Sequence, residues 1–391
     1  MTLNDGRVGG VKLRGQRAHL APRGFTLVGF MSSLPPPRHS SKPKGFEAQP
    51  KQAVKAVTDP EPLKLSGSDV KILEALASNP AATLAEICSM CGLSWSTVQR
   101  RVARLKKLGA FSVVGVPSLP RMGLTRMLAF SDSRTVITSP YLAGLYRTIS
   151  LEPIRVWDLL VPSKAYRDVL GRLSRAGITT LTVEFLEHDV SFSCYTDGWR
   201  VDWSELKSAW VSLKAPTPPP GRRACRIIPL KPSDLSILPF MVEEFKASLR
   251  SLSSKVGLSV SRVLASRRRL QSRGFITPIL TIADAAGLRE KYLIVLRNMK
   301  IPSCILQLPQ KTIYLTQTDG GRRLLVQASL PAGSLNPLTD LLEDSCTSIL
   351  ILDLKPNVFL KDPLKLLDRK NREWIWKKSY LEIKSKQATG P

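Results

Sequence analysis

The segment from residue 95 to residue 107 concentrates side chains that form hydrogen bonds to nucleic acids. Arginine and glutamine bind the edges of purine bases through two hydrogen bonds each, whereas lysine and arginine elsewhere on a helix bind phosphate. Both kinds of side chain recur here at helical spacing. The candidate DNA-binding residues of this segment are Trp95, Ser96, Thr97, Gln99, Arg100, Arg101, Arg104 and Lys107.

Two helices are expected before this segment, and they would position it. Ser68 is expected to cap the first of them, and Asn79 begins the turn that ends it. Thr83 and Glu86 have the spacing of a capping box, which predicts a short second helix. The order of helix, helix and cationic helix is that of a helix-turn-helix, whose last helix enters the major groove of DNA.

The third helix is predicted to start after a turn at Gly92, with Ser94 as its cap, and to end near Leu108. One stripe of it is apolar and is expected to be buried: Val98, Val102, Leu105 and Leu108. Trp95 either inserts against DNA or shields the core, and its place near the apolar stripe favours packing. Residues 111–116 have the composition of a first wing strand.

The chain repeats this pattern 165 residues later. Without a gap, the segment 68–111 aligns with 233–276, and the matches include Ser68 with Ser233, Asp69 with Asp234 and Gly92 with Gly257. Agreement at one unchanged offset predicts a tandem duplication. The second copy departs from the first at Arg267, Pro239 and Arg323, but its outer face keeps four candidate DNA-binding residues: Ser261, Arg262, Arg268 and Arg269.

The run from Gly92 to Phe111 resembles the helix-turn-helix of the leucine-responsive/asparagine-synthase regulator (Lrp/AsnC) family. The resemblance implies a βαββαβ effector and dimerisation module after each DNA-binding unit. In the first half the candidate elements are a strand at Leu124–Phe130, a helix at Tyr141–Thr148, a strand or hairpin at Ile154–Val161, a helix at Tyr166–Ala176 and a strand at Thr179–Leu186. The run 157–161 is similar to the family's aromatic–Asp–apolar run, which implies that Asp158 lies near an effector.

The fold class expected from these patterns is α+β, with two winged helix-turn-helix domains alternating with two βαββαβ (ferredoxin-like) modules. The expected order is a disordered basic arm (1–63), a winged helix-turn-helix (64–116), a module (117–212), a proline-rich linker (213–229), a degenerate winged helix-turn-helix (230–280), a module (281–360) and a basic tail (361–391) with a terminal helix. The two modules are expected to pair as a pseudo-dimer within one chain, with further homo-oligomers left open.

Composition agrees with a polyanion as partner. The 391 residues hold 58 Lys and Arg against 31 Asp and Glu, a net charge of +27, and 43% of them are hydrophobic. A positive field of this size suits double-stranded DNA. The apolar runs are strand-sized, so no membrane partner is predicted. Six cysteines without framework spacing favour a reducing, cytoplasmic setting, here with the nucleoid.

Other chemistry has weaker support in the sequence. Cys88 and Cys91 form a C-x-x-C without two further ligands, so core packing is favoured over a metal site. Tryptophans 199, 203, 210, 374 and 376 are expected to cap the sheets rather than to stack on single strands. The candidate polar cluster for catalytic chemistry is Asp158, Glu184, Glu187 and His188.

The function predicted is that of a DNA-binding transcriptional regulator, with a small-molecule effector as a further partner, no cofactor and no enzymatic activity. Two alternatives stay open. Some proteins with the same regulator-like architecture are sirohaem decarboxylases, which makes a tetrapyrrole enzyme the rival hypothesis. A chromatin-type protein that coats DNA without sequence preference would use the same basic surface.

Overall fold

The computed structural model describes residues 61–148, 154–208, 211–214, 227–318, 321–343, 346–353, 360, 362–368 and 370–385. These residues belong to one compact unit of the chain, residues 48–391. The predicted N-terminal arm lies outside them except at its end, where the Leu63 amide donates to the Ala285 carbonyl at 2.8 Å. Residues 215–226 of the predicted linker also lie outside the described residues.

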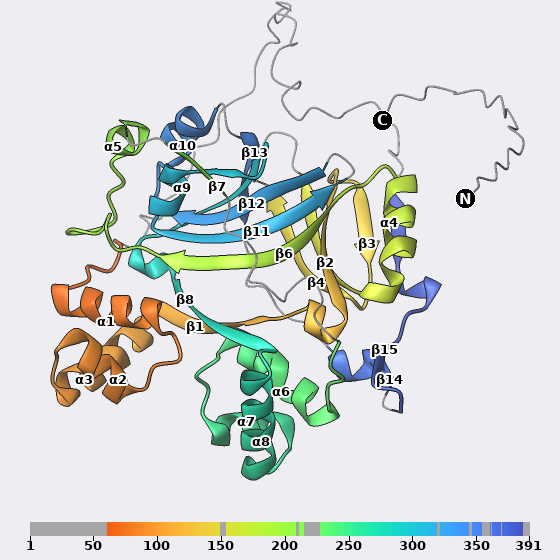
Figure 1. Ribbon diagram of the computed structural model, residues 1–391, viewed down its shortest axis with the longest axis horizontal. Coiled ribbons are helices and arrows are strands. Elements are labelled where there is room, and N and C mark those ends of the chain that lie inside the picture. The colour runs from red at the N-terminus through yellow and green to blue at the C-terminus, as the bar shows by residue number, and fades with distance from the viewer. Residues whose placement is uncertain are drawn as a thin grey trace, which may run out of the picture. The chain divides into compact units, whose positions relative to one another are not determined.

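Helices α1 (Gly67–Ser78), α2 (Leu84–Cys91) and α3 (Trp95–Lys107) form a first three-helix unit, drawn in orange in Figure 1. It packs around the buried residues Ile72, Leu73, Ile87, Val98 and Leu105. The predicted caps Thr83 and Ser94 are both present. The first helix, however, is capped by Ser66 and not by Ser68, because Asp69 lies three residues after Ser66 and closes a capping box with it.

Helices α6 (Pro232–Glu243), α7 (Leu249–Val256) and α8 (Val260–Ser272) form a second three-helix unit, drawn in green (Figure 1). Each of them begins and ends 165 residues after its counterpart in the first unit. Gly257 adopts the left-handed conformation of Gly92, with φ of 65° and 66°. Pro239 lies inside α6 without ending it. The two units therefore have the same element bounds.

The strand that follows each unit pairs with the strand that follows the other. β1 (Phe111–Pro117) and β8 (Ile276–Ile282) are antiparallel, and their middle pair is Val114 with Ile279. The predicted strand is present, but its partner is β8 and not a wing strand of its own half. Since Val114 and Ile279 lie 165 residues apart, the local two-fold axis of the strand pair relates the two halves of the chain.

Eight strands form one closed antiparallel sheet (Figure 1). The first half supplies β2 (Leu124–Ser131), β4 (Leu142–Thr148), β5 (Arg155–Pro162) and β6 (Thr179–Val190). The second half supplies β9 (Glu290–Leu296), β11 (Gln310–Thr318), β12 (Gly321–Leu330) and β13 (Cys346–Asp353). The strand orders are β4-β5-β2-β6 and β11-β12-β9-β13, and the sheet closes where β6 pairs with β11 and β13 with β4. The two halves thus contribute equivalent edges to both seams.

The predicted βαββαβ order holds in the second half, where α9 (Ser303–Gln307) and α10 (Leu335–Leu342) lie between strands. Among the described residues between β2 and β6, the first half has the later helix, α4 (Tyr166–Arg175), alone: the helix predicted over 141–148 is wrong, because this segment is β4. Its apolar spacing suits either element. Tyr146 points into the closed sheet and donates to Asp158 Oδ2 at 3.1 Å, so burial and pairing with β5 decide in favour of a strand.

The segment after each module packs on the other half. α5 (Trp203–Ser208) and β7 (Ser212–Lys214) follow the first module, and β7 pairs with β10 (Lys300–Pro302). β14 (Leu367–Asp368), β15 (Glu373–Trp374) and β16 (Glu382–Ser385) follow the second, and β16 pairs with β3 (Thr135–Thr138). The terminal helix predicted for the basic tail is therefore wrong, because this segment completes a sheet of the first half. Short 3-10 turns complete the described elements: Pro120–Met122, Ser163–Ala165, Asp284–Ala286, Pro363–Leu366 and Lys378–Tyr380.

Two tryptophans attach the segments that follow the modules to the opposite half of the chain. Trp199 Nε1 donates to the Ala286 carbonyl at 2.8 Å, and Trp374 Nε1 donates to the Met122 carbonyl at 2.6 Å. Each acceptor lies in the 3-10 turn that follows β8 or β1, in the half opposite to the tryptophan. Both rings are buried, which supports the packing interpretation over single-strand stacking. Trp210 lies outside the described residues.

Candidate DNA interface

The outer face of α3 presents most of the side chains that were predicted to contact DNA. Ser96, Gln99, Arg100 and Lys107 are exposed on this face, while Val98 and Leu105 are completely buried on the opposite one. Thr97 is half-buried and accepts a hydrogen bond from the cap, Ser94 Oγ, at 2.9 Å. The helix therefore separates a cationic outer face from an apolar inner face, as a recognition helix requires.

Two details of the predicted stripe are wrong. Trp95 is 53% exposed, so it does not shield the core. Trp95 is the first residue of α3. Because side chains lean toward the N-terminus of a helix, its ring extends past the start of α3, where no further turn of the helix covers it. Leu108 is 43% exposed because it is the residue after the helix and not part of its last turn. Trp95 is thus exposed at the N-terminal end of α3.

Two of the predicted DNA contacts are engaged within the protein. Arg101 Nη1 lies 3.0 Å from Asp69 Oδ1 and donates to Ser66 Oγ at 2.6 Å, and Arg104 Nη1 lies 3.4 Å from Asp69 Oδ2. Burial by itself raises the pKa of Asp69, but hydrogen bonds from Ser66 and Arg101 outweigh it and hold that pKa below its ordinary value. Arg101 therefore fastens α3 to α1, whereas Arg104 makes a longer contact with Asp69 and its side chain is 48% exposed.

The second unit repeats this ion pair. Arg269 Nη2 lies 2.6 Å from Asp234 Oδ1, and these residues are the counterparts of Arg104 and Asp69. The other predicted DNA contacts of α8, Ser261, Arg262 and Arg268, are exposed. The sequence offered a signal for the ion pair, since aspartate and arginine match at the same offset in both copies.

Arg267 occupies the place of the apolar Val102 without leaving its charge unpaired. Its guanidinium donates to the carbonyls of Ala247 and Phe245 at 2.9 and 2.8 Å. Burial lowers the pKa of this guanidinium. The carbonyl pair explains how the second unit tolerates a cation at a core position.

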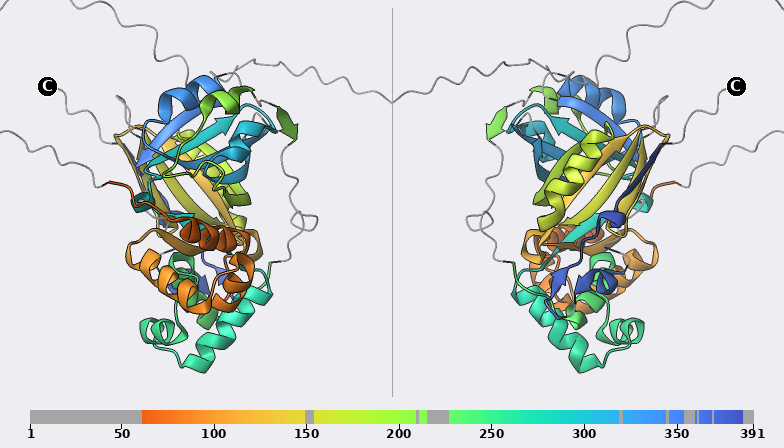
Figure 2. Two further views of the ribbon diagram at one scale, coloured as in Figure 1. Left: turned by 90° about the vertical axis from the view of Figure 1, so that its left-hand side faces the viewer. Right: turned by 90° about the vertical axis from the view of Figure 1, so that its right-hand side faces the viewer.

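Direct contacts join the two three-helix units. Lys246 Nζ, before α7, donates to the Ala82 carbonyl, before α2, at 2.6 Å. The Phe245 amide donates to the Val113 carbonyl of β1 at 2.8 Å. Burial, together with the nearby Lys106, lowers the pKa of Lys246 to about 8. Figure 2 shows both units at the same end of the closed sheet. The sequence alone did not identify Lys246, because its counterpart in the first unit is an alanine.

Hydrogen bonds also link the β1–β8 pair to the closed sheet. His188 Nε2 lies 2.6 Å from the Leu280 carbonyl, and its Nδ1 lies 2.7 Å from Thr312 Oγ1. The Gln310 side-chain oxygen accepts from the Ile282 amide at 2.6 Å. Burial lowers the pKa of His188 to about 4, so the ring is neutral near pH 7. His188, which the sequence placed in a cluster for chemistry, acts here as a structural link.

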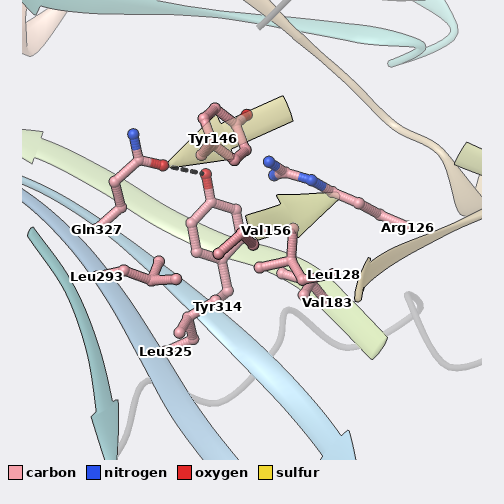
Figure 3. Close-up of a pocket in the computed structure, with 9 residues that line it drawn as sticks. All are labelled: Arg126, Leu128, Tyr146, Val156, Val183, Leu293, Tyr314, Leu325 and Gln327. Atoms are coloured by element: carbon pink, nitrogen blue, oxygen red, sulfur yellow. Dashed lines mark hydrogen bonds between the residues drawn. The ribbon is translucent and has the colours of Figure 1, made fainter. Parts of the chain in front are cut away.

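Asp158 contacts Arg126 and Tyr146, two residues that line the pocket shown in Figure 3. Arg126, one of the lining residues, binds both carboxylate oxygens of Asp158, at 2.9 and 2.7 Å, and stacks over the Tyr314 ring at 5.2 Å. Asp158 is 2% exposed. Burial opposes the charge of Arg126, but Asp158 holds the pKa of the guanidinium well above its ordinary value. This carboxylate is therefore already paired, and an effector contact for it stays a prediction.

The described residues contain no group of three metal-ligating side chains. Cys88 and Cys91 are half-buried and pack against the core of the first unit, as the packing interpretation expected. Within the described part of the chain, no helix is both long enough and apolar enough to span a bilayer.

Comparisons with known proteins agree on the first unit. Residues 65–110 match the model of a winged helix-turn-helix DNA-binding family. This match covers α1, α2 and α3 with the capped turn between them, so the first unit is a winged helix-turn-helix. No curated protein matches the sequence.

Three solved structures are similar to parts of the chain. The Mycobacterium tuberculosis leucine response regulatory protein (LrpA) is 22% identical over 30% of this chain and 88% of its own, with a TM-score of 0.20. A mutant of Rv3291c is 26% identical over 29% of this chain and 86% of its own, with a TM-score of 0.21. PH0061 is 16% identical over 33% and 99%, with a TM-score of 0.24. At these TM-scores the likeness carries no conclusion about fold or function.

Proposed function

We propose that this chain is a DNA-binding transcriptional regulator in which one polypeptide supplies both halves of a pseudo-symmetric reader. In this proposal α6, α7 and α8 form a second helix-turn-helix, which arose with its module by tandem duplication. The shared element bounds at one offset support the duplication. The closed sheet, with its two equivalent seams, supports an intrachain pseudo-dimer.

The antiparallel β1–β8 pair carries the proposal. Its central pair, Val114 with Ile279, puts a local two-fold axis between the two helix-turn-helix units. Units related in this way read half-sites of opposite direction, so the target is an imperfect inverted repeat. Lys246 and Phe245 hold the units together, which fixes the spacing of the half-sites.

The candidate contacts divide by chemistry. Gln99 and Arg100, exposed in the first half of α3, supply base-edge hydrogen bonds, and Trp95 lies at the entering end of the helix. Phosphate contacts come from the cations Arg104, Lys107, Arg262 and Arg268. Such a regulator works on the nucleoid in the cytoplasm, and its response to a small-molecule effector stays a prediction.

Selection from a pool of random duplexes tests this function. We expect the full chain to enrich an inverted repeat and to prefer it over random DNA at physiological salt. Arg100→Ala should reduce affinity for that site by about 1–3 kcal/mol. Arg134→Ala, which removes the same charge from an exposed turn after β2, is the matched control.

Two other outcomes would each replace the proposal. Tight binding without an enriched motif, with a steep salt dependence, would indicate a DNA-coating protein. The absence of duplex binding would remove DNA recognition altogether and make tetrapyrrole binding the next measurement.

A further inference from the structure

The outer faces of α3 and α8 differ at the positions that matter most for base recognition. Both helices begin with a serine cap, Ser94 or Ser259, and both carry an exposed serine two residues later, Ser96 or Ser261. The two helices differ in the next turn. Where α3 carries Gln99 and Arg100, α8 carries at the same offset Leu264 and Ala265.

The features kept in α8 are those that dock a helix on the phosphate backbone. Capping hydroxyls and helix N-termini bind phosphate without regard to sequence. Arg268 stands in α8 where α3 has Ala103, one turn beyond the base-reading positions, and Arg262 stands where α3 has Thr97. Both arginines are exposed. The second helix therefore keeps the serine cap, carries cations of its own for docking, and lacks the Gln–Arg pair that recognises purines in α3.

We propose that the operator is asymmetric, with one half-site read through α3 and the other mainly contacted through its backbone by α8. This inference rests on the proposed function. Gln99 binds an adenine edge and Arg100 a guanine edge, each through two hydrogen bonds. Leu264 and Ala265 offer no donor and contact only thymine methyl groups. The α8 half-site consequently tolerates most base changes and favours thymine where it has a preference.

The rigid connection between the units makes this asymmetry useful. Because Lys246 and the β1–β8 pair fix the second unit to the first, docking of α8 adds phosphate contacts at a set distance from the specific half-site. Affinity then comes from both units, whereas sequence choice comes mainly from one.

The test measures affinity for the selected duplex after either half-site is scrambled. Each wrong base pair at a bidentate contact costs about 1–3 kcal/mol, which is about 5- to 150-fold in affinity. We expect scrambling of the α3 half-site to reduce affinity by at least about 30-fold, and scrambling of the α8 half-site by less than about fivefold. Arg100→Ala should weaken discrimination in the α3 half-site, at the base pair that Arg100 contacts, and leave the α8 half-site unchanged.

A gain-of-function variant tests the cause. Leu264→Gln combined with Ala265→Arg gives α8 the pair present in α3 and should raise discrimination in the second half-site to about tenfold or more. If the wild-type chain discriminates equally between base pairs in the two half-sites, the asymmetry is contradicted but the proposed regulator is not. If the wild-type chain enriches no motif at all, the result contradicts the proposed function itself and not only the asymmetry. Should the double variant misfold, Arg100→Ala still decides, because loss of discrimination in both half-sites contradicts the inference.

Discussion

Gly115 in β1 packs closely against the second half of the chain. A Cβ atom at this position would lie 2.3 Å from Ile276 Cδ1 and 2.7 Å from the Met241 carbonyl oxygen. Ile276 belongs to β8 and Met241 to α6, so both neighbours come from the second half. The side chain can rotate, but the carbonyl cannot move without the backbone of α6.

Gly115→Ala should therefore destabilise the protein and shift the second unit relative to β1. Restoring ordinary contact requires a displacement of about 1 Å, and overpacking of this kind costs about 1–3 kcal/mol. An unfolding entropy of about 2.1 cal/mol/K per residue gives about 1.4 °C per kcal/mol for a protein of this size, so the melting temperature should fall by about 1–4 °C. Affinity for a duplex with both half-sites should fall as well, because their spacing is set by this contact.

Thermal melting and duplex binding are measured on the same preparations. Gly67→Ala is the matched control, since a Cβ there meets nothing within 4 Å and alanine favours helix α1. In an Ile276→Ala background, the cost of Gly115→Ala should shrink but not vanish, because the Met241 carbonyl remains. If Gly115→Ala melts at the same temperature as the wild type, the close approach of Gly115 to Ile276 and Met241 is refuted.

Three further predictions concern the links between elements. Because the pKa of His188 is lowered to about 4 in the folded state, the unfolded chain binds more protons between pH 4 and 6.5. The free energy of unfolding should therefore fall by up to about 3 kcal/mol as the pH drops through that window. His188→Gln should flatten this pH dependence in urea titrations, and an unchanged slope would contradict the prediction. Asp158→Asn should cost about 3–5 kcal/mol by leaving Arg126 buried without its partner, whereas Asp158→Leu with Arg126→Met should recover most of that loss in the same titrations. Trp374→Phe and Trp199→Phe should each cost about 1–3 kcal/mol by leaving a carbonyl without its donor, and strongly unequal losses in melting experiments would argue against equivalent roles for the exchanged segments.

The local elements of the two three-helix units followed from short-range chemistry. Thr83 with Glu86, the serine caps of α3 and α8, and the left-handed glycines all act within four residues, so their effect is visible in the sequence. The one wrong cap, Ser68, shows the limit of this approach. Two serines two residues apart offered the same signal, and the position of Asp69 decided between them.

Segments whose partners are distant could not be predicted in this way. The run 141–148 has apolar residues that suit a helix or a strand, and only pairing with β5 selects the strand. The predicted wing strand was correct as a strand, but its partner comes from the other copy. Likewise, the predicted phosphate contact Arg101 is fastened to Asp69, because the sequence gives the faces of a helix but not the neighbours of a flanking side chain.

The sequence by itself determined that this protein has a duplicated pattern with two cationic third helices, because capping and helical periodicity depend on residues within one or two turns. Tertiary structure decided how the copies combine: which strands close the sheet, which arginines are held by aspartates, and how each trailing segment crosses to the other half. The contacts between the two halves join residues that are at least 86 positions apart, as Lys214 and Lys300 are. They depend on complementary surfaces that form only once both halves have folded, and no local pattern encodes them.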